Sequence, residues 1–200
     1  MSLTQIIGLL ATLLTVVAYV PYIKVIRAGQ VKPHFFSWLI WSLTTSIVFV
    51  AQLAAEGGAG AWPTAVSAMI TLYVAWLALV LRSDFSNTTT DGCFLLAALL
   101  SLPVWFVTDD PMWSVVILTV VDALGFGPTL RKVWHKPHEE STQFYLLFAV
   151  RSMLSVLALE NRTLTTVLFP AVMIVACVVV CGMLWWRRRS VPLPSATFAE

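Results

Sequence analysis

The chain contains very little charge for its length. Only 11% of its 200 residues are Asp, Glu, Lys or Arg, and 59% are hydrophobic. A typical soluble domain carries about 25% charged residues, so this shortage excludes a soluble globular protein of ordinary composition. We therefore expect the main partner of the chain to be a lipid bilayer and expect no nucleic acid to bind.

Cysteine and lysine are also scarce, and both shortages exclude a class of protein. The three cysteines, Cys93, Cys177 and Cys181, are too few for a disulfide framework and are expected to be small packing residues. No lysine follows Lys136, which excludes a retinal photoreceptor, because that class needs a lysine in its last helix. The histidines have no neighbouring ligands, and no nucleophile lies in the apolar segments beside a polar group. The sequence therefore predicts no metal site, no cofactor and no enzyme.

Long apolar segments make up most of the chain. The hydrocarbon core of a bilayer is roughly 30 Å thick and is crossed by about 20 apolar residues in a helix. The sequence predicts seven such helices and an all-α polytopic membrane protein. The segments cover residues 3–26, 35–55, 62–81, 93–107, 112–133, 142–159 and 164–186. Residues 191–200 follow as a Pro- and Ser-containing tail that we expect to be disordered and cytoplasmic.

The basic residues gather at alternate ends of these segments. Arg162 stands alone on the opposite side, and Arg151 lies inside a segment. The other ten basic residues follow the first, third, fifth and seventh segments: Lys24, Arg27, Lys32, Arg82, Arg131, Lys132, Lys136, Arg187, Arg188 and Arg189. By the positive-inside rule, the C-terminus is predicted to be cytoplasmic and the N-terminus outside, in a plasma (inner) membrane.

An internal repeat relates the two halves of the chain at an offset of 107 residues. Matched pairs at this offset are Pro21 and Pro128, Lys24 and Arg131, Trp38 and Tyr145, Trp41 and Phe148, Pro63 and Pro170, and Arg82 and Arg189. The repeat predicts triple-helix units over residues 1–83 and 112–190, joined by a linker with the fourth helix at 84–111. Because the single linker helix restores the orientation, the two units are predicted to be parallel repeats.

These features resemble the PQ-loop superfamily, which includes the SWEET sugar transporters. The resemblance rests on a proline near the end of the first helix in each unit, Pro21 and Pro128, followed by a basic loop and a second helix. Where the family motif has Pro-Gln, this chain has Pro21-Tyr22 and Pro128-Thr129. The resemblance covers residues 1 to about 190 and implies two parallel triple-helix bundles in a 3+1+3 arrangement.

The same resemblance implies a function. It implies a small-molecule transporter, passive or proton-coupled, that works by alternating access between the two bundles. The expected substrate is a sugar, an amino acid or a vitamin-like molecule, and a homo-oligomer is compatible with the sequence. The alternative is a ligand-binding membrane receptor or sensor on the same fold, because the KDEL receptor is similar to the SWEET proteins.

Two charged residues lie deep inside predicted helices. Asp122 and Arg151 are roughly 13 to 17 Å from the cytoplasmic ends of their helices at 1.5 Å per residue. Charges at this depth usually face the interior of a bundle, and they mark functional sites by default. Asp122 is a candidate proton or substrate-cation site, and Arg151 is its counter-ion or an anion clamp. The alternative is a static ion pair that fixes the packing of the helices.

The repeat adds two hydroxyl residues to this prediction. Thr15 and Thr44 occupy the positions in the first half that match Asp122 and Arg151 in the second. A purely architectural ion pair is expected in both halves, but only the second half carries the charges. We therefore expect the four side chains to surround one polar site between the halves.

Helix-breaking and aromatic residues complete the candidate site. Pro21 and Pro128 each remove a helical hydrogen bond, so they are predicted hinges, with a fixed kink as the alternative. Gly125 and Gly127 loosen the helix around the second proline and are assigned to the same hinge. The aromatic residues Trp38, Trp41 and Tyr145 are candidates for stacking on a flat or sugar-like substrate, although an interfacial aromatic belt equally explains Trp38.

Overall fold

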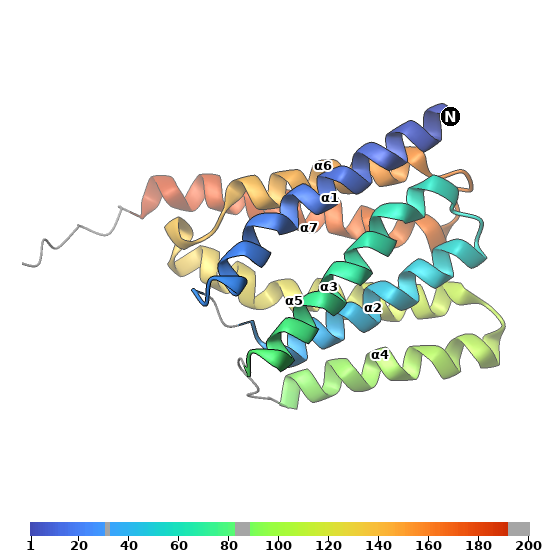
Figure 1. The fold of residues 1–200 in the computed structure, drawn as a ribbon, viewed down its shortest axis with the longest axis horizontal. Helices are drawn as coiled ribbons and strands as arrows, with labels where there is room; N and C mark the ends of the chain where they lie inside the picture. The colour runs from blue at the N-terminus through green and yellow to red at the C-terminus, as the bar shows by residue number, and fades with distance from the viewer. Residues whose placement is uncertain (31–32, 83–88, 192–200) are drawn as a thin grey trace, which may run out of the picture.

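The structure is a computed structural model that describes residues 1–30, 33–82 and 89–191 (Figure 1). Over these residues it contains seven α-helices and no strand, which confirms the all-α prediction and the seven predicted helices. The helices are α1 (Leu3–Arg27), α2 (Phe35–Ala54), α3 (Trp62–Val80), α4 (Thr89–Thr108), α5 (Pro111–His135), α6 (Thr142–Ala158) and α7 (Leu164–Ser190). Two 3-10 turns, η1 (Gly58–Ala61) and η2 (Pro137–Glu139), precede α3 and α6. Most of the predicted tail lies outside the described residues.

Six of the seven helices are long and apolar enough to cross a membrane, which fits a multi-pass integral membrane protein. Helix α6 is shorter, with 17 residues. At 1.5 Å per residue it spans about 25 Å, less than the roughly 30 Å of a hydrocarbon core. Helix α4 begins four residues before the predicted segment, and α7 continues four residues beyond its predicted end.

Polar side chains fix the starts of several helices. Ser2 accepts a hydrogen bond from the backbone N–H of Gln5, and the Gln5 side chain accepts one from the backbone of Ser2, forming a capping box at α1. Ser141 accepts a hydrogen bond from the backbone N–H of Phe144 at the start of α6. Such caps satisfy backbone donors that have no partner inside the helix. The loops therefore define where α1 and α6 begin.

The helices form two groups that meet in the middle of the molecule. Helix α3 packs against both α1 and α2, and α7 packs against both α5 and α6. The two groups meet where α1 packs on α6 and where α2 packs on α5. Helix α4 lies at the edge of the bundle against α5 and α2, and only Ala98 and Ser101 of its residues are buried (Figure 1).

Hydrogen bonds join the two groups at the end of the bundle that carries η1. The amide of Gln52 is buried and donates to the carbonyl oxygen of Thr166 at 3.1 Å. The amide of Asn161, in the connection between α6 and α7, donates to the carbonyl oxygen of Ala55 at 3.1 Å. Interhelical hydrogen bonds of buried amides hold helices together in a membrane, where water does not compete for them. This end of the bundle is therefore tied across the two groups.

Glycine allows the backbones to come close at the same end. The Ser155 hydroxyl donates to the carbonyl oxygen of Gly60 at 2.7 Å, and a Cβ on Gly60 would lie 2.7 Å from the backbone nitrogen of Leu159. On the other side of η1, a Cβ on Gly8 of α1 would lie 2.6 Å from the carbonyl oxygen of Ala59. The Gly-rich stretch of η1 is therefore a packing surface as well as a turn.

We expect the substitution Gly8→Ala to destabilise the protein, because the added methyl group overlaps the backbone of η1. Overpacking of this kind costs about 1 to 3 kcal/mol. The matched control is Gly182→Ala in α7, where a Cβ would meet nothing within 4 Å. In the control, the helix preference of alanine stabilises by up to about 1 kcal/mol. Thermal unfolding of the purified protein in detergent measures both, and equal midpoints for the two variants would contradict the proposed contact.

Candidate functional site

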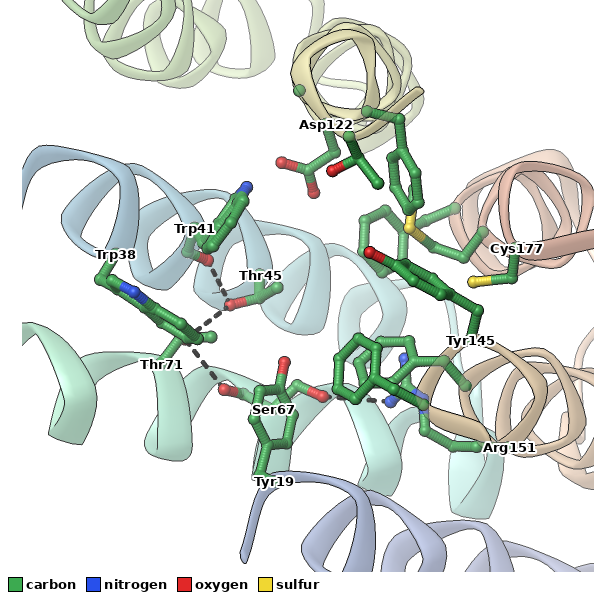
Figure 2. Close-up of a pocket in the computed structure, with 17 residues that line it drawn as sticks. Tyr19, Trp38, Trp41, Thr45, Ser67, Thr71, Asp122, Tyr145, Arg151 and Cys177 are labelled. Carbon is green, nitrogen blue, oxygen red and sulfur yellow. Dashed lines mark hydrogen bonds between the residues drawn. The ribbon is translucent and has the colours of Figure 1, made fainter. Parts of the chain in front are cut away.

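A cavity of about 170 Å³ lies between the two groups of helices (Figure 2). Its lining comes from six helices, α1, α2, α3, α5, α6 and α7, and includes no described residue of α4. The aromatic lining residues are Tyr19, Trp38, Trp41, Phe126, Phe144, Tyr145, Phe148 and Phe169. A cavity of roughly 150 Å³ holds one benzene molecule, so this cavity is large enough for a ligand built on a single ring.

Asp122 of α5 lines this cavity and is 7% exposed. Its Oδ1 accepts a hydrogen bond from the hydroxyl of Thr44 on α2 at 3.1 Å. The Thr44 hydroxyl is fully buried and is also 3.2 Å from the carbonyl oxygen of Trp41. Asp122 is thus held at the boundary between the two groups of helices by a neutral donor.

Arg151 of α6 also lines the cavity and is 3% exposed. Its Nη1 donates three hydrogen bonds to the first half of the chain, to Ser67 Oγ at 3.1 Å, Pro63 O at 3.2 Å and Thr15 Oγ1 at 3.4 Å. The guanidinium lies over the ring of Phe148, 4.5 Å from its centroid. These contacts match a desolvated cation, which needs acceptors or an aromatic face in place of water.

The two charged residues are held by the opposite half of the chain and not by each other. Among the residues that the structure describes, no ion pair joins Asp122 and Arg151, and Figure 2 shows them on opposite sides of the cavity. The predicted polar site is therefore two separate pairs, Thr44 with Asp122 and Thr15 with Arg151. The offset of 107 residues exchanges one pair for the other, so both hydrogen bonds follow the internal repeat.

The three predicted aromatic residues all line the cavity. Trp38 is 8% exposed, and its ring is stacked on that of Tyr22 and meets Trp41 edge-on. Trp41 is 37% exposed, and Tyr145 donates a hydrogen bond from its hydroxyl to Glu140 at 3.1 Å. Trp38 is thus part of the cavity wall, where the sequence left an interfacial position equally open.

Aromatic residues at matched positions of the repeat form opposite parts of the wall. The lining pairs at an offset of 107 residues are Tyr19 and Phe126, Trp38 and Tyr145, and Trp41 and Phe148. Each pair contributes one ring from each half of the chain. The cavity is therefore lined by both copies of the repeat in equivalent positions.

The predicted hinge residues occupy different surroundings. Pro21 lies inside α1, which is helical from Leu3 to Arg27. Helix α5 continues through position 128, but the side chain of Pro128 lies outside the described residues. Gly125 lines the cavity, where a Cβ would be 3.8 Å from Nε1 of Trp41, and a Cβ on Gly127 would meet nothing within 4 Å. Gly125 therefore belongs to the cavity wall, and the hinge remains a prediction.

Hydroxyl residues of α3 are part of the site that we did not predict from the sequence. Thr64, Ser67 and Thr71 are all buried, and Ser67 and Thr71 line the cavity. Their spacing of three and four residues places them on one face of a helix. A hydroxyl stripe in an otherwise apolar helix is the signal that indicates this face, because membrane proteins turn such residues toward neighbouring helices.

Cys177 was expected to be a packing residue, and it lines the cavity. Among the described residues, no group of three or more His, Cys, Asp or Glu side chains is placed to hold a metal ion. No protein-family model, curated protein or solved structure matches this chain. The interpretation of the site therefore rests on its own residues.

We expect Thr15→Val to destabilise the protein more than Thr12→Val does. Both hydroxyls donate to the carbonyl oxygen four residues earlier, but only Thr15 also accepts from Arg151. The difference between the two valine variants measures that interhelical bond, which should contribute about 0.5 to 1.5 kcal/mol. Unfolding midpoints in detergent provide the comparison, and indistinguishable variants would show that the bond contributes nothing to stability.

Proposed function

We propose that the chain is a small-molecule membrane transporter that works by alternating access. The moving parts are two triple-helix bundles, α1 to α3 and α5 to α7, joined by α4 as the linker helix. The cavity between them is the substrate site, and α6 acts as the seventh crossing despite its length. In this proposal the N-terminus is outside and the C-terminus is cytoplasmic.

The observation that carries the proposal is the position of the cavity between two equivalent groups of helices. Its wall includes aromatic residues from matched positions of both halves, and each charged lining residue is hydrogen-bonded to the other half. Transporters built from repeats bind their substrates at such an interface, near the middle of the membrane. A ligand in this cavity would contact both bundles and bias their relative position.

The tied end of the bundle supplies the closed gate of this proposal. The bonds from Gln52 to Thr166 and from Asn161 to Ala55 cross between the bundles at the end predicted to face outside. Opening that end requires these hydrogen bonds to break and the packing around η1 to separate. The structure therefore fits the state in which the outer side is closed, which is one of the two states that alternating access requires.

A ligand panel tests the substrate site. We expect at least one member of a panel of sugars, amino acids, vitamins and nucleosides to raise the unfolding midpoint of the purified protein. Saturation at 100 times the dissociation constant stabilises by about 2.7 kcal/mol. The stabilisation should be lost in Arg151→Lys, because a lysine cannot reproduce the planar fork of donors.

The matched control for this panel is Arg162→Lys. Arg162 is an exposed arginine at the connection between α6 and α7, away from the cavity lining. The same ligand should also exchange across the membrane of proteoliposomes that contain the protein. Saturable binding without any exchange would overturn transport and favour the receptor or sensor alternative.

Asp122 is the candidate for proton coupling in this proposal. We expect Asp122→Asn to remove the stimulation of uptake by an imposed proton gradient, since the amide cannot carry a proton between the two sides. The matched control is Asp109→Asn, at an exposed carboxylate with a φ of 52° that asparagine tolerates. Uptake in proteoliposomes at several pH values provides the measurement. If Asp122→Asn left uptake and its pH dependence unchanged, Asp122 would not be the coupling residue.

A further inference from the structure

We infer that the cavity selects a zwitterion built on one apolar ring, with its ammonium group at Asp122 and its carboxylate at Arg151. This inference rests on the proposed function, because it names the class of substrate for the same site. It follows from the unused hydrogen-bonding capacity of the two charged residues, from their charges, and from the size and wall of the cavity.

Both charged residues keep capacity for a ligand. Among the described residues, Asp122 accepts a hydrogen bond only at Oδ1, from Thr44. Arg151 donates all three of its hydrogen bonds through Nη1, and its Nε is buried without a partner. An arginine guanidinium offers five N–H donors in a fixed fork, and a carboxylate offers two acceptor oxygens. The residues therefore present a donor edge and an acceptor oxygen that the protein leaves unused.

Charge balance favours a ligand that carries both signs. Asp122 and Arg151 are buried in one cavity, and the described residues form no ion pair with either. Removing one partner of a buried charged pair is strongly unfavourable, because the other charge is left uncompensated. A cationic ligand would compensate only Asp122, and an anionic ligand would compensate only Arg151. A zwitterion compensates both at once without adding net charge to the membrane interior.

The cavity wall and the placement of the charges define the body of this ligand. The volume of about 170 Å³ and the wall of aromatic rings suit one apolar or aromatic ring. Asp122 and Arg151 lie on opposite sides of the cavity in Figure 2. The two ionic groups of the ligand are therefore expected at opposite ends of the ring, in contrast to an α-amino acid, which carries both on one carbon.

A series of ligands with one body and different charges tests the inference. The probes are 4-(aminomethyl)benzoic acid as the zwitterion, 4-methylbenzylamine as the cation, and 4-methylbenzoic acid as the anion. Affinities for the purified wild-type protein come from the dependence of the unfolding midpoint on ligand concentration. Each hydrogen-bonded charge is worth roughly a factor of ten or more in affinity, so the zwitterion should bind at least about tenfold more tightly than either analogue.

L-Phenylalanine is the second zwitterion in the series and tests the spacing of the charges. It should bind more weakly than 4-(aminomethyl)benzoic acid, because its ammonium and carboxylate cannot reach both sides of the cavity. Equal or tighter binding of L-phenylalanine would overturn the opposite-ends arrangement. An anion or a cation that bound as tightly as both zwitterions would overturn the inference as a whole.

Two variants provide a crossed control. Asp122→Asn should bind 4-methylbenzoic acid in preference to 4-methylbenzylamine, and Arg151→Gln should show the reverse preference. Because each variant is compared with itself across ligands, a general loss of stability cannot produce opposite preferences. An unchanged preference in both variants contradicts the assignment of the two ends.

Transport is measured separately from this selectivity. Exchange of a neutral sugar or nucleoside in proteoliposomes, together with no preference for a zwitterion, would overturn this inference and leave the proposed transporter standing. Selective binding of the zwitterion with no exchange across the membrane would do the opposite. The two proposals can therefore fail independently.

Discussion

The structure depends on placing two charged side chains inside a membrane protein without pairing them with each other. Asp122 and Arg151 are buried among helices, where an uncompensated charge is strongly unfavourable. Each is held by hydroxyl or carbonyl groups of the opposite half, through Thr44 for the acid and through Thr15, Ser67 and Pro63 for the base. These bonds link the halves while leaving part of each charged group facing the cavity.

The repeat explains why these bonds form as they do. Its two copies place equivalent positions across one interface, so Thr15 meets Arg151 where Asp122 meets Thr44. The charged members both belong to the second half, and the hydroxyl members both belong to the first. The geometry of the cavity is therefore nearly symmetric while its charge is not. Such a site gives an asymmetric ligand one preferred orientation.

The sequence predicted those parts of the molecule that follow from composition and periodicity. Long apolar segments predicted the seven helices, and the depth of Asp122 and Arg151 predicted that both face the interior. The sequence did not identify their partners, because α5 and α6 follow each other in the chain but both pack on α7, and their charges meet residues of α1, α2 and α3. It also treated η1 as a simple turn, since the close approach of Gly60 to Leu159 depends on contacts distant in sequence.

The length of α6 has a consequence for the lipid around the protein. A helix of 17 residues that crosses the bilayer is several ångströms shorter than an average hydrocarbon core, and lipid adapts to such a mismatch by thinning locally. Arg151 lies near the middle of this helix, so water and headgroups on both faces come closer to its guanidinium than they would beside a longer helix. The thickness of the host membrane, set by acyl chain length and sterol content, thereby becomes part of the environment of the site.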